Sequence, residues 1–468
     1  MADTHLPLPL PEPLFKSPYQ NGITDPMWPE VYPCTLEPKA RAKYLKEQIE
    51  EDRLEPGPVM VPTRKELKDH YRSDYAGRVA RQDFLSVVRA DVAAHSRDEL
   101  VMVLKRMTDI IVEQTKKKPS TKHFRQFEPI PDSYRVTITL GFGASLFTDR
   151  TGFDRFKLRS QRPNYLKTMP SFHGDAATLK PEQSASDLVL VVASDHPYVN
   201  IAIVRYIAEF FNKEFSAKHH SLGKSYDVLI CRDVEEGFAR KDKREFLRFD
   251  DGIENLQTDP RELRRLVYID HSDNEPAWCL HGSYLVYRKI RELMPVWESF
   301  TKDEQGRIIG RHKDTGKPLS RKTAGHDGMR PVFPDPKNSK DGPLAAHIRK
   351  VQPRRPEPDL FGLNDLERRF LRRPYPFFQG LDQNGQAING LQFMAFMKSI
   401  QQQFEHVVNM WQMNPDFPSP GTGVDSLYAK GVLSTIDGGY YFCPPGLKSA
   451  DDFLGSGIFA DSERRAPA

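Results

Sequence analysis

The sequence predicts an α+β fold made of two similar halves, each an antiparallel sheet with flanking helices. One strand and helix pattern recurs along the chain, and 468 residues suffice for two or three domains with a substantial core. A stretch rich in proline and arginine interrupts the second half from about residue 307 to 380. A loop of that length inside a compact domain is usually functional.

The first half reads as strand, helix, strand, strand, helix, strand. FLSVVRADV (84–92) is strand-like, and Ser96 can cap a helix whose apolar positions recur every three or four residues up to residue 115. The later elements are the alternating strand 134–143, the buried-type strand 187–195, the proline-initiated helix 197–215 and the strand 226–234. This is the ferredoxin-like order.

The same order recurs in the second half. GSYLVYRKI (282–290) predicts a strand that leads into a helix over 291–305, and GLQFMAFMKSI (390–400) leads into a helix over 401–413. GGYYFCPPG (438–446) closes this sheet. The predicted organisation is therefore an extended arm at 1–80, an amino-terminal domain at 81–260 and a carboxy-terminal domain at 261–468 that contains the insertion 307–380.

The composition limits the partners of the chain. A hydrophobic fraction of 38%, a charged fraction of 28% and a formal net charge of +4 argue against general capture of nucleic acid. The four cysteines are scattered without metal-ligand spacing, which favours a reducing compartment. We see neither a signal peptide nor an apolar run long enough to span a membrane, so we expect a cytoplasmic protein without membrane or nucleic-acid partners.

The stretch LAAHIRKVQPR (344–354) inside the insertion combines a histidine, small apolar residues and several cations. A lone histidine in a loop is most often solvated, and the cations alone would fit a surface loop or a nucleic-acid patch. A third interpretation makes His347 a metal ligand beside an anionic cofactor. These three interpretations stay open on the stretch alone.

A set of motifs carries a resemblance to a known family. The motifs are GFGASLF (141–147), FDDG (249–252), GSYLVYRKI, GRHKDTGKPL (310–319), HIRKVQPR (347–354), LRRPYPF (371–377), GLQF, QFEHV (403–407), YYFCPPG and FLGSGIFA. In this order they resemble the landmarks of the dye-decolorizing peroxidase family. The resemblance covers roughly residues 83 to 460.

The resemblance implies a haem b enzyme of the dimeric α+β barrel-like superfamily, with the haem held mainly by the carboxy-terminal half. His347 matches the family's iron ligand, and neutral imidazole suits haem iron. Small neighbouring residues leave room for a flat macrocycle. Among the cations after the histidine, we expect Arg349 and Arg354 to bind the haem propionates, while Lys350 stays an alternative.

On the opposite haem face, Asp251 matches the family's distal aspartate, with Gly252 beside the cofactor, and Arg372 matches the distal arginine. A carboxylate can carry a proton between the two peroxide oxygens, and a permanent cation can stabilise the charge that develops as they separate. Arg248 stands where the family's GxxDG motif begins with glycine, and Asp250 is the alternative carboxylate. Pro374 follows the arginine pair and leaves Arg373 as the alternative to Arg372.

The implied reaction is reduction of hydrogen peroxide and oxidation of phenolic or dye-like aromatic donors through an oxyferryl intermediate. Bulky donors would react at the surface, with Tyr375, Tyr441 and Trp411 as nominal sites. One alternative is a haem protein of the same fold that serves storage or sensing with altered or lost peroxidase activity. A distant alternative is an RNA-binding ferredoxin-like protein, whose aromatic strand signature is missing. A homo-oligomer stays open.

Overall fold

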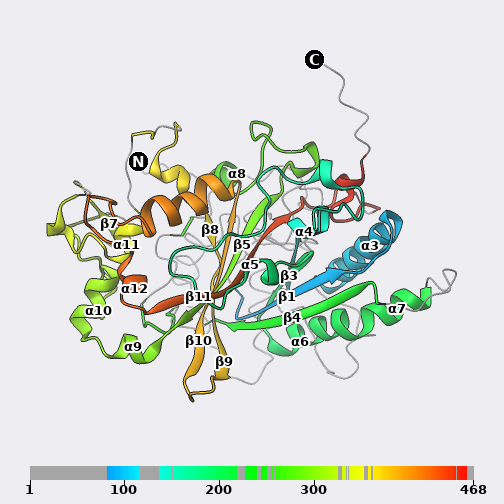
Figure 1. Ribbon diagram of the computed structural model, residues 1–468. Helices are drawn as coiled ribbons and strands as arrows, with labels where there is room; N and C mark the ends of the chain where they lie inside the picture. Colours follow the sequence, from blue (N-terminus) through cyan, green and yellow to red (C-terminus); the bar gives the residue numbers. More distant parts are fainter. Residues whose placement is uncertain are drawn as a thin grey trace, which may run out of the picture.

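The computed structural model describes residues 82–115, 136–149, 151–218, 227–239, 244–249, 255–256, 260–324, 329–333, 335, 337–352, 357–359, 362–449 and 451–460. The arm expected at residues 1–80 lies outside these ranges. One long antiparallel sheet runs through the molecule, with helices against its faces (Figure 1).

The first half of the sheet has the predicted ferredoxin-like arrangement. Its strands pair in the order β4-β1-β3-β2, and all of these pairs are antiparallel. Ser96 caps the first helix by accepting a hydrogen bond from the backbone N–H of Glu99. The elements are β1 (Phe84–Val92), α3 (Arg97–Gln114), β2 (Thr137–Gly143), β3 (Leu188–Ser194), α6 (Pro197–Arg205), the π-helix η6 (Tyr206–Phe210), α7 (Phe211–Lys218) and β4 (Leu229–Phe238).

The second half repeats this arrangement with strands in the order β11-β5-β10-β9. The single helix expected after the first strand is two helices, because Thr301 and Glu304 form a capping box that starts a new helix. The elements are β5 (Ser283–Glu292), α9 (Met294–Glu298), α10 (Lys302–Ile309), β9 (Tyr375–Leu381), β10 (Ala387–Met397), the π-helices η11 (Ile400–Glu405) and η12 (Val407–Gln412), and β11 (Leu433–Cys443). The expected α+β class with two ferredoxin-like halves is confirmed.

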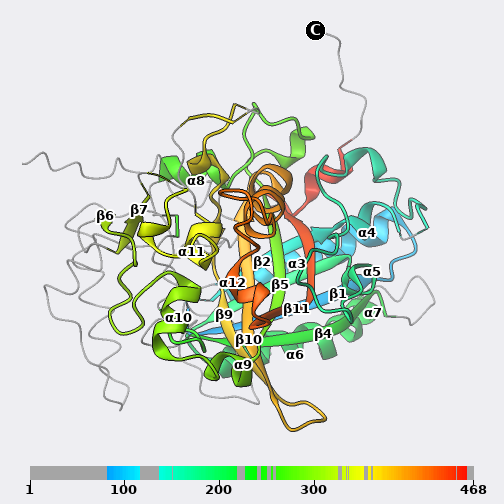
Figure 2. The same ribbon diagram turned by 60° about the vertical axis from the view of Figure 1, so that its left-hand side comes forward.

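The insertion is not a loop throughout, and the prediction was wrong at its carboxyl end. Strand β9 starts at Tyr375 and pairs with β10 in a hairpin that extends beyond the sheet in two views (Figures 1 and 2). Shorter elements precede it: β6 (Lys322–Ala324), β7 (Arg330–Val332), η9 (Ser339–Asp341), α11 (His347–Lys350), η10 (Asp365–Arg368) and β8 (Leu371–Arg372). The remaining short helices are α4 (Ala144–Phe147), η5 (Arg159–Gln161), α5 (Pro181–Ser184), α8 (Pro260–Leu266), η8 (Ala277–Cys279), α12 (Ser426–Ala429) and η13 (Ser456–Phe459).

The two halves share one sheet because β2 pairs with β11, which places Phe142 opposite Phe442 and Gly143 opposite Tyr441. The sheet then bends so that its far strands approach each other: a Cβ added to Gly237 of β4 would lie 2.9 Å from the Cβ of Tyr375 of β9. No backbone ladder joins β4 to β9 in the described residues, so the described sheet is not a closed barrel. The domain boundary at residue 260 stays a prediction.

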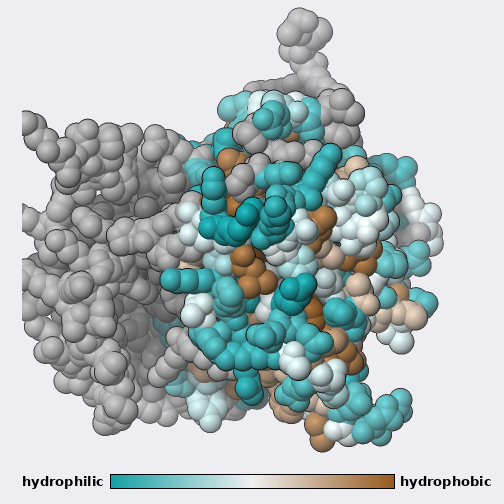
Figure 3. Space-filling view, turned by 90° about the vertical axis from the view of Figure 1, so that its left-hand side faces the viewer, coloured by the Kyte–Doolittle hydropathy of each residue, from teal (hydrophilic) through white to brown (hydrophobic). Residues whose placement is uncertain are grey.

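Two apolar clusters use the two faces of the sheet. Alternate residues of β1, such as Val88 and Ala90, pack with α3 and α6, whereas Leu85 and Val87 face a second cluster with Tyr287. Figure 2 shows α3 and α6 beside the strands of the first half. Figure 3 views the side of the molecule that carries α10, α11 and α12, and the described residues seen there are mainly hydrophilic, with apolar residues between the polar ones.

The glycines of the GFGASLF motif have a packing reason. A Cβ on Gly143 would lie 1.9 Å from the carbonyl oxygen of Ser186, so only glycine fits at this end of β2.

None of the helices in the described ranges is long and apolar enough to cross a membrane.

Candidate active site

A cavity of about 260 Å³ lies between the second half of the sheet and the helical turns η11 and η12. The ladder between β5 and β10 sets its floor, since Arg288 stands opposite Phe393 and Ile290 opposite Leu391. Most of the wall is apolar, with the aliphatic or aromatic side chains of Leu247, Phe249, Ile290, Ile309, Leu391, Phe393, Phe404, Val407, Val408, Leu427 and Leu433. This composition is typical of a site for a largely apolar ligand with a few placed polar groups.

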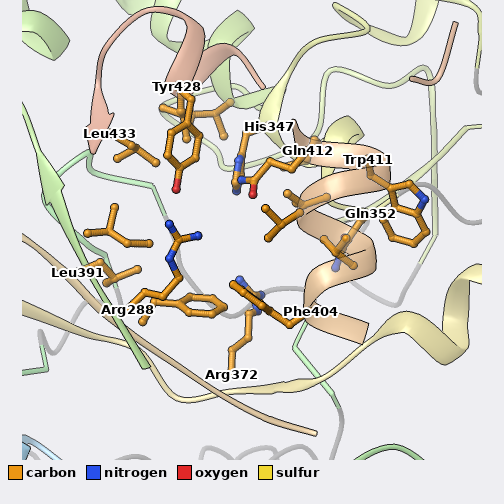
Figure 4. Close-up of a pocket in the computed structure, with 18 of the residues that line it drawn as sticks. Arg288, His347, Gln352, Arg372, Leu391, Phe404, Trp411, Gln412, Tyr428 and Leu433 are labelled. Carbon is orange, nitrogen blue, oxygen red and sulfur yellow. The ribbon is translucent and has the colours of Figure 1, made fainter. Parts of the chain in front are cut away.

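His347 lines this cavity and is held by a buried carboxylate. Its Nδ1 lies 2.6 Å from Oδ2 of Asp425, whose side chain is 0% exposed. A carboxylate accepts hydrogen bonds, so Nδ1 carries the hydrogen and Nε2 keeps its lone pair. Figure 4 shows the ring of His347 inside the cavity, close to Gln412. The imidazole is therefore fixed in the tautomer that can bind a metal through Nε2.

Asp425 is itself fixed by two further donors. Gln412 donates its Nε2–H to Oδ2 at 3.1 Å, and the backbone N–H of Leu427 donates to Oδ1 at 3.0 Å. Asp425 is also the residue that caps α12. Both carboxylate oxygens thus have partners, and the hydrogen bond to His347 is part of a network rather than an isolated contact.

The small residues before His347 have a packing role. Ala346 is fully buried, and a Cβ on Gly310 at the end of α10 would lie 3.2 Å from its methyl group. The carbonyl oxygen of Ala345 accepts two hydrogen bonds from Ser426, one from its backbone N–H and one from its hydroxyl. The methyl group of Ala346 therefore lets α11 pack closely against α10, while the backbone of Ala345 joins α11 to α12.

Arg372 also lines the cavity, and in Figure 4 it enters from the side opposite His347. Its backbone is held by Asn255, which donates to its carbonyl oxygen at 2.6 Å and accepts from its N–H at 2.9 Å. The neighbouring Arg373 instead donates to the side chain of Gln82 at 2.8 Å. Of the two arginines that the sequence offered, Arg372 is the one at the cavity.

Three expected site residues, Asp251, Gly252 and Arg354, lie outside the described residues, as does the alternative Asp250. The described residues on either side of this gap lie at the site: Phe249 lines the cavity, and Asn255 hydrogen-bonds to the backbone of Arg372. The roles of the undescribed residues stay predictions.

Arg349 lies on the same short helix as His347, but its described contacts lead elsewhere. Its guanidinium carbon is 4.5 Å from the ring centroid of Phe333, and it donates to the carbonyl oxygen of Asn338 at 3.1 Å. Burial lowers the pKa of Arg349. Its assignment to a propionate stays a prediction.

Sequence reasoning missed two polar residues of the wall, Arg288 and Tyr428, whose polar ends point toward each other in Figure 4. Arg288 is 3% exposed and donates to Asp175 and Thr435. Burial raises the pKa of Asp175, although Arg288 opposes this, and burial also raises the pKa of Tyr428. Arg288 is thus a buried cation that Asp175 already neutralises, and it lies beside the phenol of Tyr428 at the wall. The strand motif GSYLVYRKI contained this arginine, but its inward direction needed the sheet register.

The acid partner of His347 was also missed. Glu405, an acid of the QFEHV motif, does not have this role, because it pairs with Lys167 at 2.9 Å and accepts a hydrogen bond from Tyr440. Asp425 follows His347 by 78 positions, and only the fold shows that they meet.

The aromatic residues named for surface oxidation are buried. Tyr375 and Tyr441 are each 1% exposed, and Trp411 is 4% exposed. Tyr441 lies 3.0 Å from the hydroxyl of Ser186, and Trp411 stacks on Phe417. None of the three can meet a bulky donor at the surface directly, so that expectation was wrong.

The residues of the cavity fit haem. A tetrapyrrole needs a flat apolar site, an axial nitrogen and cations for its carboxylates. The apolar wall, Nε2 of His347 and the guanidinium group of Arg372 supply these three features. The other arginines of the wall already have protein partners: Arg288 pairs with Asp175, Arg368 with Asp359 and Arg369 with Glu262, while Arg311 donates to backbone carbonyl oxygens. Among the described residues, no three His, Cys, Asp or Glu side chains converge to hold a bare metal ion.

Comparison with known proteins agrees with this geometry. The model of the "Dyp-type peroxidase, N-terminal" family matches residues 79–223, and that of "Dyp-type peroxidase, C-terminal" matches residues 242–448. The chain belongs to the Dyp-type peroxidase family. Membership confirms the resemblance seen in the sequence and the expectation of a haem peroxidase.

Relatives and solved structures agree with the family. Proteins named Deferrochelatase from Escherichia coli K12 and Shigella flexneri are 28% and 29% identical, covering 86% of this chain and 90% of theirs. A DyP-type peroxidase from Streptomyces coelicolor aligns with a TM-score of 0.65 at 23% identity, covering 82% of this chain and 94% of its own. An oxyferrous/water complex of DtpA from Streptomyces lividans aligns with a TM-score of 0.64 at 23% identity, covering 81% and 93%. These structures share the fold.

Proposed function

We propose that this Dyp-type peroxidase holds haem b in the described cavity with His347 as the axial ligand of the iron. The observation that carries the proposal is the buried hydrogen bond from Nδ1 of His347 to Asp425, at the wall of a cavity that Arg372 also lines. When bound, haem supplies an iron that binds peroxide and accepts its oxidising equivalents. Asp425 draws the Nδ1 hydrogen and makes Nε2 a stronger donor to that iron.

The opposite wall would act on the peroxide. Arg372 places a permanent positive charge in the cavity, which stabilises the negative charge that develops as the oxygen–oxygen bond breaks. Asp251 would take the proton from one peroxide oxygen and return it to the other. The contacts of Phe249 and Asn255, which flank the loop with Asp251, support this assignment because both lie at the site. The donors we propose are phenolic or dye-like aromatic compounds, and a cytoplasmic location stays a prediction.

The test is an absorption spectrum of the purified protein after loading with haem, compared with that of His347→Ala. We expect a strong haem band in the wild type and its loss or displacement in the variant. His173→Ala is the matched control, since His173 is exposed. An unchanged spectrum in His347→Ala would show that the axial ligand is another residue.

The name of the curated relatives favours a second candidate function. Those proteins are called Deferrochelatase, which suggests removal of iron from haem. Anaerobic incubation of the haem-loaded chain with a ferrous chelator tests it, because iron-free porphyrin is fluorescent and haem is not. Stopped-flow mixing with hydrogen peroxide tests the peroxidase separately, so the two activities can be scored independently.

A further inference from the structure

Lys350 is a fully buried cation on the helix that carries His347. Its Nζ donates to three backbone carbonyl oxygens: those of Asn414 at 2.7 Å, Phe417 at 2.6 Å and Gly423 at 3.0 Å. It also lies 5.6 Å from the ring centroid of Phe417. All three acceptors belong to the segment 414–423, which joins η12 to α12.

Burying an ammonium group is costly unless its hydrogens are all bonded. An ammonium has three donors, and three carbonyl oxygens accept them here. Burial lowers the pKa of Lys350 to about 8, and the charge of Asp425 opposes this. The side chain is therefore mainly cationic at pH 7. Through these three hydrogen bonds, Lys350 joins both ends and the middle of segment 414–423 to α11.

The fastened segment leads directly to the partner of the histidine. Gly423, whose carbonyl accepts from Lys350, also donates to the carbonyl oxygen of Pro415 at 2.8 Å. Two residues later the backbone N–H of Asp425 donates to the carbonyl oxygen of Gln412 at 2.9 Å. The one-turn helix α11 therefore presents the imidazole at its start and, three residues on, holds the segment that presents the carboxylate.

We propose that Lys350 is a positioning residue, which fixes segment 414–423 and thereby sets the hydrogen bond between Asp425 and His347. This inference rests on the proposed function, because it takes His347 as the ligand of the iron. Through that hydrogen bond, Lys350 governs how strongly Nε2 donates to the metal. A role as a mere fold-stabilising residue, or as a charge acting through space, would give different results.

The test compares Lys350→Met with Lys430→Met, a control that removes an exposed lysine near the same segment. The first measurement needs no cofactor: hydrogen exchange of the haem-free protein, followed by mass spectrometry at pH 7. In Lys350→Met we expect the backbone amide hydrogens of residues 412–425 to exchange faster than in the wild type. In Lys430→Met they should exchange at the rate of the wild type. Unchanged exchange of this segment would overturn the anchoring role whether or not the chain binds haem.

The second measurement is the iron–histidine stretching frequency of the ferrous protein by resonance Raman spectroscopy. We expect a lower frequency in Lys350→Met, because a displaced Asp425 draws the Nδ1 hydrogen less. Asp425→Asn should lower it as well, and the double variant should match Asp425→Asn alone. The reaction with peroxide should slow by about 10-fold, the lower end of the effect of residues that support a metal ligand.

Three further results would overturn the proposal. A folded Lys350→Met protein with lower thermal stability and an unchanged frequency would make Lys350 purely structural. A higher frequency would indicate a charge effect on Asp425, since loss of the cation strengthens the pull of the carboxylate. Additive effects in the double variant would place Lys350 outside the path through Asp425. If His347→Ala kept the iron–histidine band, the proposed function would fail instead.

Lys350→Gln serves if the methionine variant does not fold. Its amide keeps two hydrogens for the carbonyl oxygens. We expect a shift of the stretching frequency in the same direction but smaller, and no shift would contradict the proposal.

Discussion

Nδ1 of His347 lies 2.6 Å from Oδ2 of Asp425, whose side chain is fully buried. This relationship predicts that Asp425→Asn weakens the donor strength of Nε2, because a neutral amide draws the Nδ1 hydrogen less than a carboxylate. We expect a reaction with peroxide that is slower by roughly 10- to 100-fold while haem is retained. Stopped-flow absorption spectroscopy measures the rate.

The control for this change is Glu298→Gln, which neutralises an exposed carboxylate on α9. It should react at the rate of the wild type. Equal rates in Asp425→Asn and the wild type would mean that the hydrogen bond does not influence the metal.

The pair Arg372 and Arg373 gives a second prediction, because the chain places these neighbours in different surroundings. Arg372 lines the cavity, whereas Arg373 donates to Gln82. Arg372→Leu should slow the reaction with peroxide by about 100-fold, since one stabilising donor is lost. Arg373→Leu should leave this rate near that of the wild type. The reverse order of the two rates would assign the distal role to Arg373.

Local patterns predicted most of the fold because most elements carry their own signals. Strand β1 alternates between the two clusters and α3 begins at the capping residue Ser96, so both were visible without the structure. Strand β9 was missed because the stretch 307–380 is rich in proline and arginine and was assigned to an insertion as a whole. The hairpin signal was nevertheless present as Asn384 and Gly385, with φ of +75° at the glycine.

The site was less accessible than the fold for a physical reason. His347 and Arg372 lie within the motifs HIRKVQPR and LRRPYPF, so the family resemblance could point to them. Asp425, Gln412 and Lys350 act through contacts that join distant segments, and an aspartate after a glycine-rich turn has no pattern of its own. Such partners become visible only when the backbone has been placed.

Arg248 gives a third prediction, about stability. Its φ is +67°, a left-handed conformation that costs a residue with a side chain about 1–2 kcal/mol. This explains why the family's motif has glycine at this position. Arg248→Gly should therefore raise the free energy of unfolding by about 1 kcal/mol, after the larger entropy of the unfolded glycine chain is deducted. Urea unfolding monitored by circular dichroism measures it.

The matched control for the arginine is Arg307→Gly, in the last turn of α10, where the backbone is still helical. Glycine at a helical position should lower the free energy of unfolding by up to about 1 kcal/mol. We therefore expect the free energy of unfolding to rise in Arg248→Gly and to fall in Arg307→Gly. A lower free energy of unfolding in Arg248→Gly would show that the contacts of the arginine side chain stabilise the fold by more than the backbone strain destabilises it.

The fourth prediction concerns acid, and it comes from the loop before β5. Burial alone would raise the pKa of Asp270, but hydrogen bonds from Lys398 and Ser272 lower it to about 2. As the pH falls, the Asp270 carboxylate of the unfolded chain takes up a proton near its ordinary pKa of 3.8, whereas the folded protein takes up this proton only at lower pH. The stabilisation from Asp270 is complete above that value and is lost as the pH falls toward about 2.

Asp270→Asn should accordingly be less stable than the wild type at neutral pH, and the difference should shrink as the pH falls below about 4. Urea unfolding at a series of pH values between 7 and 3 checks this. Lys398→Met should lose much of the same pH dependence, because Nζ of Lys398 donates to Asp270 at 2.8 Å. A difference in stability that stays constant down to pH 3 would show that the carboxylate is not held in its charged form by these partners.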